Sequence, residues 1–122
     1  MILLDTNALL WLDQGHRRAR ALAADARRLY VSPATILELL MLVEVGRLKT
    51  GVAVFDHIVI DDRWLIDEPP ALGWFEEAAE LTWTRDPFDR LIMAHARYRG
   101  WRLATADQAM LAQLSARERI EL

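Results

Sequence analysis

Four acidic residues of this sequence have the residue type and the placement to do chemistry: Asp5, Glu38, Asp89 and Asp107. Carboxylates that share a pocket repel one another, and at about 5 Å with an effective dielectric near 20 each pair costs roughly 3 kcal/mol. Protonation would relieve this repulsion, and so would a hard divalent cation such as Mg²⁺ or Mn²⁺. Such a cation lowers the pKa of a bound water and neutralises charge on phosphoryl oxygens, which suits hydrolysis of a phosphodiester bond.

Two of the four acids follow predicted strands. Asp5 ends the apolar run Ile2–Leu4, which is predicted near the centre of a small sheet, where an unpaired carboxylate would be costly. Asp107 comes after a strand predicted over residues 101–105. Each has a structural alternative as the N-cap of the next helix, which for Asp107 is predicted to run from it to Leu114.

Glu38 is the only charged residue in the apolar stretch from Ala34 to Val43. A helix that is apolar on all sides is expected to be buried or to lie in an interface. A buried carboxylate needs a partner, and the structural alternative to a metal ion is a salt bridge to an arginine. Glu44, near the end of the same helix, is expected to face solvent.

Asp86 and Asp89 stand at another predicted helix start. Asp86 precedes a proline and is expected to be the N-cap, which places Asp89 at the third helical position, near the positive end of the helix dipole. Helix capping and the helix dipole are sufficient to explain Asp86 and Asp89 when this pair is considered alone. The convergence of Asp5, Glu38, Asp89 and Asp107 on one edge of a sheet is what points to chemistry.

Other kinds of site have little support in the sequence. The chain has no cysteine, and its three histidines, His16, His57 and His95, are scattered, so a zinc site is disfavoured and thiol chemistry is excluded. His95 is expected to be a helix-face residue. There is no P-loop, no glycine-rich dinucleotide motif and no G-x-S-x-G motif.

Strands and helices that alternate along the chain must position these acids. Short apolar runs predict strands over residues 2–4, 29–31, 64–66, 101–105 and 120–122. Helices are predicted from residue 8 onward and over residues 17–28, 33–45, 54–60, 71–81, 87–99 and 107–114, with Gly46 and Gly100 as left-handed ends of two of them. The pattern predicts an α/β fold with a mostly parallel central sheet of four to five strands and helices on both faces, and ligands of such sheets bind beyond the carboxyl ends of the strands.

Length and composition predict a single domain over residues 1–122. The chain is 53% hydrophobic, which is enough for a substantial core. With 15 basic and 18 acidic residues the net charge is -3, which argues against a polycation that coats nucleic acid. The sequence shows neither a signal peptide nor a membrane span, and the expected location is the cytoplasm.

Four segments of the sequence also carry a family resemblance. In order, they are Leu3-Leu4-Asp5-Thr6-Asn7-Ala8-Leu9-Leu10-Trp11, Ser32-Pro33-Ala34 through Glu38 and on to Gly46-Arg47-Leu48, Arg85-Asp86-Pro87-Phe88-Asp89-Arg90-Leu91-Ile92, and Leu103-Ala104-Thr105-Ala106-Asp107. Together they resemble the PIN-domain ribonucleases and, within them, the VapC toxins of type II toxin–antitoxin pairs. The resemblance spans nearly the whole chain but leaves the stretch from residue 61 to residue 83 without a clear alignment.

The resemblance implies an endoribonuclease that depends on Mg²⁺ or Mn²⁺. It implies that the metal-binding and catalytic acids are Asp5, Glu38, Asp89 and Asp107, assisted by Asp86. It also implies orienting roles for Thr6, Asn7, Ser32 and Thr105, which could hydrogen-bond to the acids. The implied partners are an RNA substrate, a VapB-like antitoxin and a second copy of the chain, and the apolar stretch from Leu39 to Val43 could serve either protein partner.

Alternatives of other classes remain open from the sequence. A phosphatase of the haloacid dehalogenase type also has an aspartate after its first strand, as part of a D-x-D motif. In this sequence the position of the second aspartate is occupied by Asn7. A non-catalytic PIN scaffold and an RNA-processing PIN nuclease without an antitoxin are further alternatives. Candidate phosphate contacts are Arg17, Arg18, Arg85 and Arg90, for which a role as solvated surface charges is an equal alternative.

Overall fold

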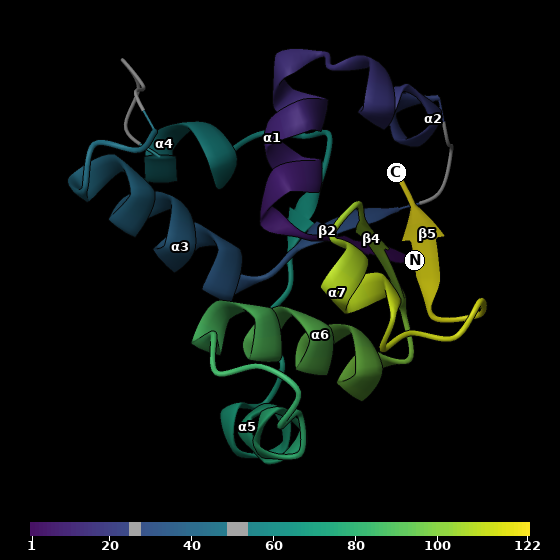
Figure 1. Cartoon of the computed structure of the whole chain (residues 1–122). Coiled ribbons are helices and arrows are strands. Elements are labelled where there is room, and N and C mark those ends of the chain that lie inside the picture. The colour runs from purple at the N-terminus through teal and green to yellow at the C-terminus, as the bar shows by residue number, and fades with distance from the viewer. Residues whose placement is uncertain (25–27, 49–53) are drawn as a thin grey trace.

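The computed structural model of the chain describes residues 1–24, 28–48 and 54–122. Its centre is a five-stranded sheet with the strand order β3-β2-β1-β4-β5 (Figure 1). All four strand pairings are parallel, so the carboxyl ends of the strands lie at one edge. The strands are β1 (Ile2–Leu4), β2 (Leu29–Val31), β3 (Leu65–Ile66), β4 (Arg102–Thr105) and β5 (Arg119–Glu121).

Helices connect the strands and cover both faces of the sheet. They are α1 (Thr6–Gln14), the 3-10 helix η1 (Arg17–Ala19), α2 (Arg20–Ala23), α3 (Pro33–Glu44), α4 (Val54–Ile58), α5 (Ala71–Ala79), α6 (Pro87–Arg99) and α7 (Gln108–Leu111). In Figure 1, α1 and α2 lie above the sheet, and α5 and α6 lie below it. None of the described helices combines the length and the apolar character needed to cross a bilayer. The predicted α/β fold is confirmed.

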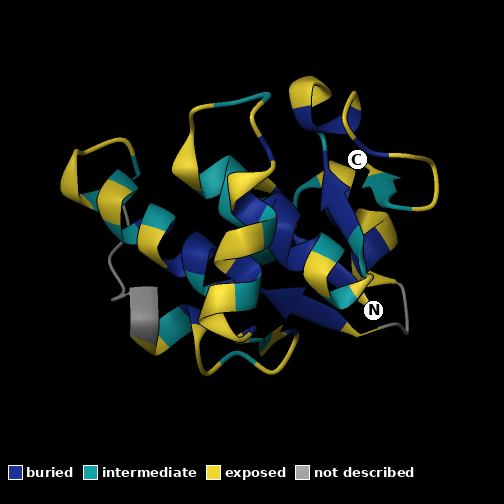
Figure 2. Ribbon diagram, turned by 90° about the horizontal axis from the view of Figure 1, so that it is seen from below, coloured by how far each residue is buried: buried dark blue, intermediate teal, exposed yellow. Residues whose placement is uncertain are grey.

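The core has two halves because neighbouring strand residues point to opposite faces. Ile2 and Leu4 pack with α1, α3 and α4, whereas Leu3 packs with α5 and α6. All three residues of β1 are fully buried, as are β1's neighbours Val31 and Leu103. Figure 2 shows these strands in the buried colour, with exposed residues gathered on the outer helix faces. The burial on both faces explains why β1 is a continuous apolar run rather than an alternating one.

Local signals set most helix ends as predicted. Ser32 and Asp86 are N-caps, each followed by a proline at the first helical position, and Gly46 and Gly100 have positive φ values of 75° and 70°. The helix predicted over residues 17–28 is shorter than expected: η1 and α2 end at Ala23, and residues 25–27 lie outside the described part of the chain. Among the described residues of this segment, Ala19 and Leu22 are the ones that reach the core, so little packing supports a longer helix there.

The last predicted helix is also shorter. It was expected over residues 107–114, but α7 ends at Leu111. The next turn is tighter, because Gln113 N–H donates to the Met110 carbonyl and Leu114 N–H to the Leu111 carbonyl, three residues back in each case. This turn buries Leu114 against the same core as Met110.

A buried polar cluster ties α6 to the end of β3. His95, on α6, has no exposed surface, and its Nε2 lies 2.7 Å from an oxygen of Asp67, which follows β3. Arg99, one turn further along α6, donates to both oxygens of Asp67 at 2.9 and 3.2 Å. The Trp74 and His95 rings pack edge to face, with their centroids 5.4 Å apart. His95 is therefore a helix-face residue as expected, but one that is buried and paired.

Candidate active site

The four predicted acids line one cavity at the carboxyl edge of the sheet. The cavity has a volume of about 390 Å³ and lies where β1 and β4 end and where α6 begins. Asp86 joins Asp5, Glu38, Asp89 and Asp107 in its lining, which makes five carboxylates in all. The structure thus brings together residues from four separate parts of the chain, two of which follow parallel strands as predicted.

Asp5 is the most deeply buried of these carboxylates, with 6% of its surface exposed. Its Oδ1 accepts a hydrogen bond from the Ala8 N–H at 2.7 Å, so it is the N-cap of α1. Its own N–H donates to the Ala104 carbonyl at 3.1 Å, which fixes it to β4. A carboxylate has two oxygens, so a cap made with one of them leaves the other able to coordinate a cation.

Asp86 and Asp107 also cap helices. Oδ1 of Asp86 accepts from the N–H groups of Phe88 and Asp89 at 2.8 and 3.1 Å. Oδ1 of Asp107 accepts from the N–H groups of Ala109 and Met110 at 2.8 and 3.1 Å. Both predicted capping roles are confirmed. The amino ends of α1 and α6 therefore face the cavity, and their positive dipole ends offset part of the carboxylate repulsion.

Glu38 enters the cavity from α3, and a threonine holds it there. The Thr6 hydroxyl donates to Oε1 of Glu38 and lies 3.5 Å from the hydroxyl of Thr35. Glu38 is half-buried, and among the ion pairs between described residues it has no arginine partner. Within that part of the chain the salt-bridge alternative for Glu38 is therefore not observed. Glu44 is exposed, as expected.

Burial and mutual repulsion disfavour the charged form of these acids. Burial raises the pKa of Asp5 from 3.8 to about 6, although the Thr105 hydroxyl and the Ala8 N–H oppose the shift. Burial, together with the charges of the four neighbouring carboxylates, raises the pKa of Asp89 from 3.8 to about 6. The pKa of Glu38 is raised, chiefly by burial. Such a cluster gains stability from a bound proton or cation.

The donor set of the cavity fits a hard divalent cation. The described lining residues offer carboxylate oxygens but no histidine or cysteine ligand. Oxygen donors of this kind suit Mg²⁺ and Mn²⁺ better than zinc. The five carboxylates could therefore hold such a cation, while the hydroxyl of Thr6 keeps Glu38 oriented.

The residues predicted to orient the acids have different positions. Thr6 and Asn7 line the cavity, and Asn7 is exposed there. Thr105 is fully buried, and its hydroxyl accepts from the Asp107 N–H at 3.0 Å. Ser32 is not among the lining residues, and its hydroxyl accepts from the Ala34 N–H at 3.2 Å as the N-cap of α3.

None of the arginines predicted as phosphate contacts lines this cavity. Arg18 packs over the Trp11 ring at 4.8 Å, and Arg90 donates to the Thr84 carbonyl at 2.7 Å. Arg17 and Arg85 are exposed. The sequence reasoning missed Arg47, which does line the cavity. Its only signal in the sequence is its place in the Gly46-Arg47-Leu48 segment.

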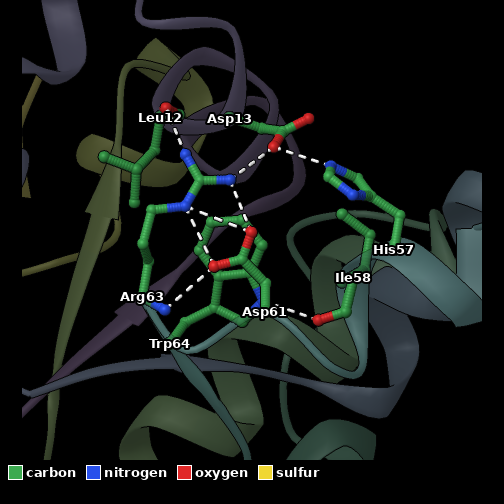
Figure 3. A network of polar contacts seen from close by, with 7 residues as sticks. All are labelled: Leu12, Asp13, His57, Ile58, Asp61, Arg63 and Trp64. Carbon is green, nitrogen blue, oxygen red and sulfur yellow. Dashed lines mark hydrogen bonds and ion pairs between the residues drawn. The ribbon is translucent and has the colours of Figure 1, made fainter.

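A second polar cluster lies at the other end of α1 (Figure 3). Asp13, His57 and Asp61 each offer a ligand-type atom, and these atoms lie within 4.8 Å of one another. However, one guanidinium nitrogen of Arg63 lies 2.6 Å from both Asp13 and Asp61, and His57 Nε2 lies 2.9 Å from Asp13. The arginine already neutralises the acids that a metal would need. We regard this cluster as an ion-pair network that joins α1 to the segment before β3.

Comparisons with known proteins agree with this fold. The sequence matches the family model described as PIN domain over residues 2–115. A search of the curated proteins finds no match. Among solved structures, the chain is similar to a toxin–antitoxin complex from Klebsiella pneumoniae, with 20% identity and a TM-score of 0.72 over 100% of both chains.

Two further solved structures are similar in fold. The chain is 19% identical to VapBC2 from Rickettsia felis bound to a DNA fragment from its promoter, with a TM-score of 0.69 over 100% of this chain and 99% of the other. It is 24% identical to FitAcB from Neisseria gonorrhoeae, with a TM-score of 0.57 over 92% of this chain and 91% of the other. Identities this low relate the folds alone.

Proposed function

This chain belongs to the PIN domain family, and from that premise we propose that it is a metal-dependent endoribonuclease that acts as the toxin of a type II toxin–antitoxin pair. The single observation that carries the proposal is the convergence of five carboxylates in one cavity at the carboxyl edge of the sheet. The toxin role is supported by the similar fold of the Klebsiella pneumoniae structure, which is described as a toxin–antitoxin complex. The family match gives no support to the phosphatase alternative.

In this proposal Asp5, Glu38, Asp89 and Asp107 hold the cation, and Asp86 assists them. Bound Mg²⁺ or Mn²⁺ would supply an activated water and charge neutralisation at the phosphoryl oxygens. The chain's own residues position the site. Caps on α1, α6 and α7 fix three of the carboxylates, because each accepts hydrogen bonds from the first turn of its helix.

Neighbouring hydroxyls would restrict the remaining freedom of the acids. Thr6 donates to Glu38, and Thr105 accepts from the backbone of Asp107. Asn7 at the cavity wall could contact substrate or orient an acid. Ser32 would orient Glu38 only indirectly, because it caps the helix that carries Glu38.

Proteins are the other partners that we propose: a VapB-like antitoxin and a second copy of the chain. The support is an apolar surface on α3 and its neighbours, where Leu37, Met41 and Val45 are 51%, 45% and 64% exposed. A groove of about 250 Å³ next to it is lined by Ile36, Leu37, Leu40 and other mostly apolar residues. Exposed apolar surface of this kind is typical of protein interfaces.

The test of the proposed activity is cleavage of pooled cellular RNA by the purified protein with Mg²⁺ or Mn²⁺, followed by sequencing of new 5′ ends. We expect discrete new ends that disappear with EDTA. Asp5→Asn and Asp89→Asn should each reduce the cleavage rate at least ~100-fold, which corresponds to about 2.7 kcal/mol of transition-state stabilisation. The reason is that each removes a charge that the cation needs.

A matched control separates this loss from a general effect of removing an acid. Asp62 is exposed and does not line the cavity, so Asp62→Asn should keep the wild-type cleavage rate. The proposed activity is wrong if folded protein free of antitoxin yields no new ends, or if Asp5→Asn and Asp89→Asn cleave like the wild type.

A further inference from the structure

Arg47 is the one cationic side chain among the described residues that line the acidic cavity. It stands just beyond the carboxyl end of α3, whose middle carries Glu38. The residue is exposed, and within the described part of the chain its guanidinium makes no hydrogen bond or ion pair. It therefore stands beside five carboxylates without being paired to any of them within 4.0 Å.

The end of α3 fixes where Arg47 stands. Gly46 has a φ of 75°, its N–H donates to the Val43 carbonyl at 3.1 Å, and the Arg47 N–H donates to the Leu42 carbonyl at 2.9 Å. These two bonds form a Schellman motif, which folds the chain back against the last turn of the helix. Leu42 also lines the cavity, so this fold brings Arg47 to the cavity wall.

The positive charge of Arg47 is important because the cavity beside it is strongly acidic. One divalent cation would leave the five carboxylates with a net negative charge, and the substrate is itself a chain of negative phosphates. A strand that approaches the cavity is thus repelled except where a positive group receives it. The planar guanidinium of arginine matches the oxygens of a phosphate through two parallel N–H donors.

We infer that Arg47 binds a backbone phosphate of the RNA at the wall of the cavity and so positions the strand for cleavage. This inference rests on the proposed nuclease function. The competing explanation is that Arg47 only offsets repulsion among the acids of the free protein. The two differ in what they predict for RNA binding, because only a phosphate contact contributes to the salt dependence of the affinity.

The experiment measures binding of a short, mixed-sequence, fluorescently labelled single-stranded RNA to the Asp5→Asn protein with Mg²⁺, over a series of KCl concentrations. We expect Arg47→Ala in this background to weaken binding about 5- to 20-fold at low salt. The slope of log affinity against log salt should become shallower by about 0.7, the contribution of one phosphate contact to a single strand. Arg47→Lys should keep the slope and recover part of the affinity, because lysine retains the positive charge but lacks the two parallel N–H donors of the guanidinium.

Arg117 provides the matched control. It is exposed in the segment between α7 and β5, at the amino edge of the parallel sheet and away from the cavity. Arg117→Ala should leave both the affinity and the slope unchanged. In the wild-type background, Arg47→Ala should raise KM for RNA more than it lowers kcat.

The outcomes distinguish the inference from the function on which it rests. If the Asp5→Asn protein binds RNA but Arg47→Ala leaves the slope unchanged, the phosphate contact is wrong and the nuclease proposal stands. A slope that changes equally in Arg117→Ala also overturns the contact. If the Asp5→Asn protein binds no RNA at any salt concentration, the phosphate contact is wrong, and the nuclease proposal fails as well if the wild type also yields no new 5′ ends from pooled RNA.

Discussion

Single carboxylates in this protein have both a structural and a proposed chemical role. Asp5, Asp86 and Asp107 each accept backbone hydrogen bonds as helix caps, and each also lines the acidic cavity. The two roles are compatible because each cap uses one oxygen, Oδ1, and leaves the second. A change from aspartate to asparagine therefore keeps the cap and removes only the charge, since the two side chains cap helices equally well.

Asp5→Asn should stabilise the metal-free protein at pH 7. The folded-state pKa of Asp5 is raised from 3.8 to about 6. At pH values above about 6, ionisation of Asp5 therefore destabilises the folded state relative to the unfolded state. We expect the free energy of unfolding to rise by about 1–3 kcal/mol, from roughly 1.4 kcal/mol per pKa unit. The measurement is urea denaturation in EDTA.

The pH dependence of this stabilisation has a definite sign. Below about pH 3 the carboxyl is protonated in both states, so the difference between Asp5→Asn and wild type should vanish there. It should grow as the pH rises from about 3 to about 6 and then stay constant. Equal stabilities at pH 7, or an undiminished difference at about pH 3, would contradict the raised pKa.

Asp67→Asn should have the opposite effect. Burial alone would raise the pKa of Asp67, but hydrogen bonds from Arg99 and His95 outweigh it and hold the pKa below its ordinary value. The charged form thus stabilises the fold at neutral pH, and this contribution is lost as the pH falls through the folded-state pKa. We expect Asp67→Asn to lower the free energy of unfolding by about 1–3 kcal/mol at pH 7, measured beside Asp62→Asn, which should change it little. An unchanged stability would show that the cluster is not a net stabiliser.

At the scale of elements, α3 and the start of α6 supply three of the five carboxylates, Glu38, Asp86 and Asp89. α3 presents Glu38 and ends at the turn that holds Arg47, while α6 begins with Asp86 and presents Asp89 from its first turn. Both helices start with a capping side chain and a proline, and both end next to a glycine of positive φ. Their ends are therefore fixed by local sequence, and the side chains that line the cavity are fixed with them.

Ser32→Ala tests how far the cap of α3 supports the site. Ser32 is fully buried and its hydroxyl accepts from the Ala34 N–H, so we expect a loss of about 1 kcal/mol in the free energy of unfolding. The cleavage rate of the folded variant should stay within a few-fold of wild type, because the hydroxyl caps the helix rather than lining the cavity. A large loss of cleavage with unchanged stability would instead assign Ser32 a direct orienting role.

At the scale of the whole molecule, exposed apolar surface gathers beside the sheet's β3 edge. The exposed large apolar residues there are Leu37, Met41, Val45, Val59, Ile60 and Leu65, on α3, β3 and the turn after α4. Elsewhere among the described residues, the exposed large apolar side chains are Met1, Leu72, Phe75 and Tyr98. This asymmetry supports the proposal that a protein partner covers that side.

Paired substitution on this surface tests the proposed dimer. We expect the wild-type chain to be a dimer in light scattering, and Leu37→Glu with Met41→Glu to be a monomer, because two buried charges would face each other across the interface. Leu72→Glu on α5 is the control, since Leu72 is equally apolar and 86% exposed but lies on another face. A wild-type monomer at all concentrations, or a dimer that survives the paired change, would refute this interface.

The sequence by itself determined the elements and the acids. Short apolar runs predicted all five strands, and cap residues placed the starts of α3 and α6, because these signals act over a few neighbouring residues. The gathering of Asp5, Glu38, Asp89 and Asp107 could also be predicted, since parallel strands bring their carboxyl ends to one edge. Helix lengths were predicted less well where few side chains reach the core.

Only the tertiary structure decided which distant residues meet. His57 pairs with Asp13 across 44 positions and His95 with Asp67 across 28, and no local pattern marks these partners. Arg47 reaches the cavity because a turn folds it back along α3, whereas the arginines next to the acids in sequence do not line it. Such contacts depend on how whole helices and strands pack against one another. That packing is determined by the residues of the shared core rather than by the polar residues that form the contacts.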